Sequence, residues 1–185
     1  LCMFYEKRKN DIFICDRAYS GRLACEAHMH YHLELVYMYG GDSVGYVDSE
    51  RHEIPEDSLF LTFPNQLHAY ESHMKERYLI IIVNPVLMPQ LANVFDNMTL
   101  EDPVLRDVSG HPELHGILSS IRAESKREWD SFSSAKIRGL TEALFAELLR
   151  HMPLRDRIQG DSGAFREVVH YCAQNFDREL SLSLL

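Results

Sequence analysis

Apolar and polar positions divide the chain into a strand-forming part up to residue 84 and a helical part after it. The first part contains short runs of β-branched and aromatic residues between turn segments such as Gly40-Gly41-Asp42 and Pro64-Asn65-Gln66. This pattern is typical of closely spaced antiparallel strands. We therefore expect a mainly β domain, folded as a sandwich or small barrel, with strands at residues 12–15, 31–39, 43–47, 58–63 and 77–83.

In the second part the apolar positions recur at steps of three and four residues, which predicts amphipathic helices. One stripe, from Leu114 to Ile121, follows Pro112, which suits the first position of a helix. Another stripe, from Ile137 to Leu148, follows two serines at 133 and 134 that suit an N-cap. We expect an antiparallel helix pair at 112–128 and 134–151, which covers a sheet edge, pairs with a second subunit, or does both.

The C-terminal end predicts the start of a further domain. Turn residues at 153–163 indicate a linker, and apolar positions from Phe165 to Phe176 indicate one more helix before the chain ends at Leu185. One helix and part of another cannot bury a core of their own. The expected organisation is a β domain at 1–84, a helical dimerisation segment at 85–152, a linker at 153–163 and a truncated domain start at 164–185.

Composition and charge narrow the functional class. The 185 residues are 45% hydrophobic, which is enough for one core, and the net charge of -9 argues against nucleic-acid binding by this part alone. The apolar runs are too short to cross a membrane. The first residues carry no secretory signal pattern and the four cysteines form no CxxC pair, so we expect free thiols and a cytoplasmic location.

The segment from residue 28 to residue 34 carries the most informative polar pattern. His28, His30, His32 and Glu34 stand at every second position, so on a single strand all four side chains would leave the same face. In a one-sided sheet that face would lie in water, whereas in a sheet covered on both sides it would line an interior.

The residues that follow this row favour an inward orientation. Val36 and Met38 continue the same face and are unfavourable in water, so the face is expected to run from a polar mouth into an apolar interior. His68, from a later strand, would complete a set of four donors if the first strand twists or bends. Tyr70 would point the same way as His68 and either contact a ligand or fill the core.

Two short motifs resemble those of the cupin superfamily. His28-x-His30-x-x-x-Glu34 with Gly41 behind it is similar to the first cupin motif, and Pro64-x-x-x-His68 is similar to the second. The resemblance covers residues 10–84 and implies a cupin-like antiparallel β-barrel, a double-stranded β-helix. It also implies a site that either holds a divalent metal, such as Zn, Ni or Fe, or binds an organic effector without metal; its residues are His28, His30, Glu34 and His68.

A second resemblance lies near the C-terminus. Residues 168–176, followed by Leu180-Ser181-Leu182, resemble the opening of the DNA-binding domain of AraC/XylS-type transcriptional regulators. That family joins a cupin-like sensor, with helices that dimerise, to two helix-turn-helix units. The resemblance implies a domain that senses a small polar metabolite, such as a sugar, in the barrel. It further implies a homodimer through the helices at 112–128 and 134–151, and DNA contact only through recognition helices beyond Leu185.

Three functional classes follow from these patterns. The first is the sensor domain of a regulator, without catalytic residues, and the second is a metal-dependent cupin enzyme such as a dioxygenase or isomerase. The third is a dimerisation module with an empty cavity. The segment from Tyr171 to Leu182 favours the regulator, and the departures from the cupin motifs at Glu56-Asp57 and Asn65-Gln66 weaken the enzyme. The expected ligand-binding residues of the sensor are His28, His30, Glu34, His68, Tyr70 and Met38.

Overall fold

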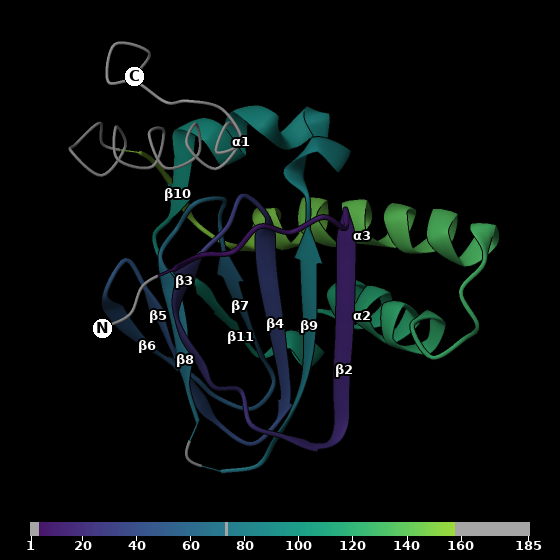
Figure 1. The fold of residues 1–185 in the computed structure, drawn as a ribbon, viewed down its shortest axis with the longest axis horizontal. Helices are drawn as coiled ribbons and strands as arrows, with labels where there is room; N and C mark the ends of the chain where they lie inside the picture. Colours follow the sequence, from purple (N-terminus) through teal and green to yellow (C-terminus); the bar gives the residue numbers. More distant parts are fainter. Residues whose placement is uncertain (1–3, 73, 158–185) are drawn as a thin grey trace.

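Two five-stranded sheets face each other in the computed structural model, which describes residues 4–72 and 74–157 (Figure 1). We name each sheet after its central strand. The β8 sheet has the order β1-β3-β8-β5-β6, and the β4 sheet has the order β11-β7-β4-β9-β2. In the β8 sheet the bounds are β1 (Phe4–Tyr5), β3 (Cys25–Met29), β8 (His68–Glu71), β5 (Ser43–Val47) and β6 (Glu50–Ile54). In the β4 sheet they are β11 (Val104–Arg106), β7 (Ser58–Thr62), β4 (Leu33–Gly40), β9 (Glu76–Val83) and β2 (Ile12–Gly21).

The other elements within the described residues are three helices, three 3-10 turns and a small two-stranded sheet of β10 with β12. The segment expected to be helical, 85–152, therefore also contains strands, and β11 completes one edge of the β4 sheet. Strand β12 occupies the first part of the expected linker at 153–163, and residues 158–185, with the predicted start of a further domain, lie outside the described residues. The bounds are η1 (Pro85–Leu87), η2 (Pro89–Leu91), α1 (Ala92–Asn97), β10 (Met98–Leu100), η3 (Val108–Gly110), α2 (Pro112–Glu124), α3 (Ser131–His151) and β12 (Leu154–Asp156).

Strand β4 separates two layers of side chains. Leu33 and Leu35 pack with apolar residues of the helices in the larger core, whereas Val36 and Met38 pack with residues of the β8 sheet in a smaller one. Because side chains alternate along a strand, Glu34 shares the inner face with Val36 and Met38. The expected inward orientation of this face is confirmed. The mainly β, cupin-like fold with its helix pair is also confirmed, but the strands of the expected barrel form two separate sheets that face each other and do not close.

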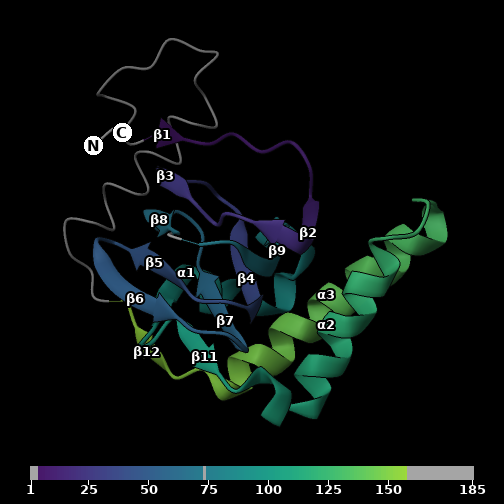
Figure 2. The same ribbon diagram turned by 90° about the horizontal axis from the view of Figure 1, so that it is seen from below.

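Helices α2 and α3 lie side by side across the outer face of the β4 sheet (Figure 2). Their apolar stripes therefore cover the face of the sheet, and not its edge as expected. Asp16 of β2 adds ion pairs to Arg122 of α2 and to Lys126, which follows this helix, at 3.2 and 3.4 Å. None of the described helices is long and apolar enough to cross a membrane. The fully buried stripe residues include Leu114, Leu118, Ile121, Ile137, Leu144 and Leu148.

The helix bounds differ from the prediction in ways that capping explains. Helix α3 begins at Ser131 because the side chain of Asp130, and not a serine at 133 or 134, accepts the hydrogen bond from the backbone N–H of Ser133, at 2.7 Å. Helix α2 starts at Pro112 as expected but ends at Glu124, four residues before the predicted end. Contact of this pair with a second subunit stays a prediction.

The histidine-rich segment is not a single strand, which corrects the sequence prediction. Strand β3 ends at Met29 and β4 begins at Leu33, and residues 30–32 form a bend that carries the chain from one sheet to the other. The backbone N–H of Asn65 donates to the carbonyl oxygen of His30 at 2.8 Å and holds the bend against the turn before β8. The alternation of side chains between the two faces of a strand therefore does not continue across residues 30–32.

Gly45 allows the two sheets to approach each other. A Cβ atom at Gly45 would lie 2.6 Å from the ring of Phe60 and 2.9 Å from Cδ1 of Ile54, and both side chains are fully buried. We expect Gly45→Ala to destabilise the domain by about 1–3 kcal/mol through overpacking, as measured by urea unfolding. Gly139→Ala is the matched control, because a Cβ at that exposed position of α3 meets nothing within 4 Å.

The control is expected to stabilise the domain by about 0.5–1 kcal/mol through higher helix propensity. A Gly45→Ala variant as stable as the wild type would contradict the close approach of the sheets at this position.

Candidate functional site

Three histidines and a glutamate converge between the two sheets, at the end where the chain bends. His28 on β3 and His68 at the start of β8 are cross-strand partners. Glu34 is the second residue of β4 in the opposite sheet, and His30 lies in the bend. The exposed fractions of these residues are only 1–3%, so all four are buried. We call His28, His30, Glu34 and His68 the four-donor cluster.

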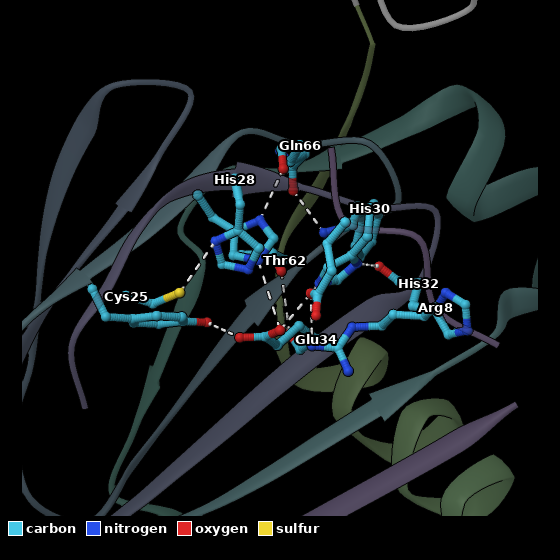
Figure 3. A network of polar contacts seen from close by, with 12 residues as sticks. Arg8, Cys25, His28, His30, His32, Glu34, Thr62 and Gln66 are labelled. Atoms are coloured by element: carbon cyan, nitrogen blue, oxygen red, sulfur yellow. Dashed lines mark hydrogen bonds and ion pairs between the residues drawn. The ribbon is translucent and has the colours of Figure 1, made fainter. Parts of the chain in front are cut away.

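The ligand atoms of the four-donor cluster are close together. One atom from each residue lies within 4.8 Å of the other three. The Oε2 atom of Glu34 is 3.1 Å from Nε2 of His30 and 3.7 Å from Nε2 of His68. Figure 3 shows His28 and His30 beside the carboxylate of Glu34. The four residues that the sequence motifs singled out are thus brought together from three strands and a bend.

Main-chain carbonyl groups fix the orientation of all three imidazole rings. A carbonyl oxygen only accepts hydrogen bonds, so the ring nitrogen facing it must carry the proton. In a neutral ring the other nitrogen, Nε2, then presents its lone pair. The three bonds run from His28 Nδ1 to the oxygen of Glu26 at 2.9 Å, from His30 Nδ1 to that of His32 at 3.0 Å, and from His68 Nδ1 to that of Gln66 at 2.9 Å.

This orientation creates a requirement for positive charge. Nε2 lone pairs and a carboxylate oxygen are all acceptors, so neutral rings at these distances from Glu34 repel it unless a cation lies between them. Nε2 of His68 is buried and has no hydrogen-bond partner among the described residues. A proton or a metal ion removes the repulsion.

The pKa shifts of Glu34, His68 and His28 agree with this need for a positive charge. Burial alone would raise the pKa of Glu34, but His30 and His68 outweigh burial and hold this pKa well below its usual value. Burial lowers the pKa of His68, but Glu34 raises it by more, so the net shift is upward. Burial, and then the neighbouring His68, lowers the pKa of His28. Glu34 is therefore ionised and His28 neutral at neutral pH, and a cation is favoured beside His68.

Tyr70 orients the carboxylate. Its hydroxyl donates a hydrogen bond of 2.8 Å to Oε1 of Glu34, which leaves Oε2 directed at the histidines. Tyr70 is 3% exposed, and burial, followed by the charge of Glu34, raises the pKa of its hydroxyl well above the usual value. Of the two alternatives that the sequence left open for Tyr70, filling the core and contacting a ligand, the structure gives it a core position in contact with a cluster residue.

Two neighbours of His28 were missed by sequence reasoning. The ring of Phe4 stacks on His28 with 5.5 Å between centroids and 16° between planes, because β1 pairs in parallel with β3. The Sγ atom of Cys25 lies 3.6 Å from Nδ1 of His28. A two-residue strand such as β1 carries no periodic signal, and Cys25 reaches His28 only across an irregularity in β3.

Met38 and His32 lie apart from the cluster. Met38 is fully buried in the smaller core, four residues along β4 from Glu34, a separation of about 13 Å at the rise of a strand. His32 turns away, with its Nε2 atom 3.0 Å from the carbonyl oxygen of Asn10. His32 is therefore a packed residue at the bend.

Comparison with known proteins identifies a family for the greater part of the chain. The family model described as the AraC-like ligand binding domain matches residues 13–149. None of the curated proteins compared matches the chain significantly.

The fold is similar to that of two proteins with known structures. The apo K231A variant of ToxT from Vibrio cholerae is 10% identical with a TM-score of 0.55, over 96% of this chain and 70% of the ToxT chain. The AraC-like transcriptional activator CuxR is 12% identical with a TM-score of 0.56, over 80% of this chain and 52% of the CuxR chain. At these identities the likeness shows a common fold.

We expect Tyr70→Phe to destabilise the domain by about 1–3 kcal/mol, because a buried carboxylate loses a hydrogen-bond donor. Tyr46→Phe is the matched control, since its hydroxyl donates to Oε2 of Glu71 at an exposed position, and its effect should stay within about 0.5 kcal/mol. Chemical unfolding of both variants measures the difference. Equal losses in the two variants would mean that Tyr70 does not support Glu34.

Proposed function

The chain belongs to the AraC-like ligand-binding domain family, and on this premise we propose that it is the effector-sensing and dimerisation part of an AraC/XylS-type transcriptional regulator. The chain spans about half of the CuxR chain that it resembles, so the DNA contacts and the regulatory activity of a whole protein are part of the proposal. An effector bound between the sheets would favour one arrangement of the domain, and its differential affinity would reposition the DNA-binding units.

The single observation that carries this proposal is the four-donor cluster. Four pre-oriented polar groups lie in the interior between the sheets, where burial of such groups is costly unless they bind something. Glu34 has partners for both oxygen atoms, but the histidine lone pairs around it still require a cation. This excess of acceptors supports a ligand-binding role beyond a structural one.

A divalent metal ion is the occupant that the donors fit best. Four atoms within 4.8 Å of one another fit a sphere of radius about 2.9 Å, and transition-metal ligand bonds are about 2.0–2.2 Å, so small movements would close the site. Three imidazoles and one carboxylate suit Zn, Ni or Fe. When bound, the ion supplies the positive charge that the lone pairs require. Its ligands would be His28, His30, Glu34 and His68.

An organic effector is the second class of occupant. A small polar metabolite, such as a sugar, would exchange hydrogen bonds with the four-donor cluster and the hydroxyl of Tyr70, and would pack against Met38. A thermal-shift screen of neutral sugars and other polar metabolites on the chain tests this class.

The proposed macromolecular partners are DNA and a second copy of the chain. DNA would be contacted only by the recognition helices of the C-terminal DNA-binding domain, in agreement with the acidic charge of the sensor. The second copy would pack on helices α2 and α3, within the expected ranges 112–128 and 134–151. Their buried stripes are already used against the β4 sheet, so the contact would use the outer face, where small exposed residues permit close approach. These residues are Gly116, Ser119, Ala123, Gly139, Ala143 and Ala146.

We propose a binding role rather than an enzymatic one, since an enzyme using the same four ligands needs open metal positions for its substrate. Turnover assays with added Fe or Mn test the alternative. Reproducible turnover that is lost in His30→Ala would favour the enzyme.

We expect the chain to bind one Zn²⁺ ion, as measured by isothermal titration calorimetry, and to unfold at a higher temperature when the ion is bound. His30→Ala and Glu34→Gln should each weaken binding by more than about 100-fold, because even changes to groups behind the ligands cost about 10–100-fold. Affinity should fall as the pH is lowered, since protons compete for the histidines.

His115→Ala is the control for this titration, because it removes an exposed imidazole on α2 that is remote from the cluster in sequence and fold. If it weakened Zn²⁺ binding as much as His30→Ala does, the ion would be binding elsewhere.

For the regulator as a whole, DNA binding by the full-length protein should respond to the occupant of the four-donor cluster, and Glu34→Gln should abolish the response. A gel-shift titration on the protein's own promoter region measures this. Indifference of DNA binding to every ligand that occupies the site would remove the sensing role.

A further inference from the structure

The four-donor cluster joins the two sheets. His28 and His68 belong to adjacent strands of the β8 sheet, whereas Glu34 belongs to the central strand of the β4 sheet. His30 lies in the bend that connects them. An ion that binds all four residues would therefore cross-link the sheets at this end of the domain.

The surroundings of the cluster are covered by protein groups. Phe4 stacks on the ring of His28, and the hydroxyl of Tyr70 donates a hydrogen bond to Oε1 of Glu34. The Nδ1 atoms of all three rings are used by main-chain oxygens. The side chains of His30 and Glu34 are 0% and 4% exposed. These contacts leave one inward atom per residue, which is the number of ligands in a closed tetrahedral site.

Buried side chains pack together on the inner face beyond the cluster. Val36, Met38 and Phe60 are fully buried, Tyr70 and Tyr78 are 3% and 5% exposed, and all five belong to one packed group. An organic molecule that extended into this layer would have to displace packed side chains, whereas a metal ion needs only small movements of the four ligands. Size and coordination therefore both favour the ion over the metabolite.

We propose that a divalent transition metal ion is itself the effector of this domain, held by the four protein ligands without an organic co-ligand. This inference rests on the proposed function of the four-donor cluster and names its ligand class. The imidazole ligands favour Zn²⁺, Ni²⁺ or Co²⁺ over Mg²⁺ and Ca²⁺, which prefer all-oxygen sites.

Strand β4 connects the ion to the helix pair. Glu34 lies between Leu33 and Leu35, which are fully buried in the larger core with residues of α2 and α3. A bound ion would hold Glu34 on the inner face of β4, and the neighbouring residues Leu33 and Leu35 pack toward the helices on its outer face. Asp16 supplies a second link, since it lies on β2 in the β4 sheet and pairs with Arg122 of α2. Ion binding is expected to restrain this sheet and the helices on it.

Visible spectroscopy of the Co²⁺-loaded chain tests whether the site is closed. Four-coordinate Co²⁺ absorbs strongly in the visible range, and six-coordinate Co²⁺ with bound water absorbs weakly. We expect the strong spectrum, unchanged by added acetate, citrate or glucose and absent in Glu34→Gln, with His115→Ala like the wild type. A weak spectrum, or one that these molecules alter, overturns the proposal, because the ion would then anchor an organic ligand.

Hydrogen exchange tests the link from the ion to the helices. When Zn²⁺ is added, amides of β4, α2 and α3 that exchange by local or sub-global opening should slow, by up to about 100-fold at about 100 times the dissociation constant if the opening disrupts the site. The effect should be lost in Glu34→Gln and kept in His115→Ala. Slowing confined to β3 and β8 would overturn the proposed connection through β4.

The outcomes separate this inference from the proposed function. If no transition metal binds but an organic metabolite binds at the cluster and changes DNA binding by the full-length protein, the sensing role stands and the metal effector is wrong. If Zn²⁺ binds in a closed site but neither it nor any metabolite alters DNA binding, both proposals fail and the ion is structural.

Discussion

The charge of one buried carboxylate is the constraint on which this structure depends. An ionised group in the interior is strongly unfavourable unless partners surround it, and Glu34 obtains these partners from the opposite sheet and from the bend between the sheets. The pairing of β3 with β8 places His28 beside His68, and the bend at residues 30–32 brings His30 to the same point. The two sheets are thus held together at one end by polar groups and elsewhere by the smaller apolar core.

Strand β4 contributes to both layers of the domain. Its side chains point alternately to the inner face, which carries the cluster and the smaller core, and to the outer face, which packs on the helices. A change at the four-donor cluster and a change at the helix pair therefore act on the same backbone. This shared strand places the four-donor cluster and the helix pair in one contiguous set of packed residues.

Much of the site could be predicted from sequence because its residues are chemically distinctive and closely spaced. The inward orientation followed from Val36 and Met38, whose side chains make a solvent-facing row unfavourable. The path of the chain could not be predicted, because the rule that placed residues 28, 30, 32 and 34 on one face holds only within a strand. A turn here depends on contact with Asn65, far along the chain, and nothing in the local pattern signals it. The cap of α3 was missed for a related reason: Asp130 and the serines after it are all suitable caps, and packing against the sheet selects between them.

The oxygens that hold the three imidazole rings belong to the main chain, at residues 26, 32 and 66. No side-chain replacement can delete a peptide carbonyl, so the ring tautomers are protected from most point mutations. Homologous proteins could change these hydrogen bonds to the histidines only by rerouting the backbone, through changes in loop length or in turn residues such as Asn65. Differences between related ligand-binding domains should therefore accumulate in these connections more than in the histidines themselves.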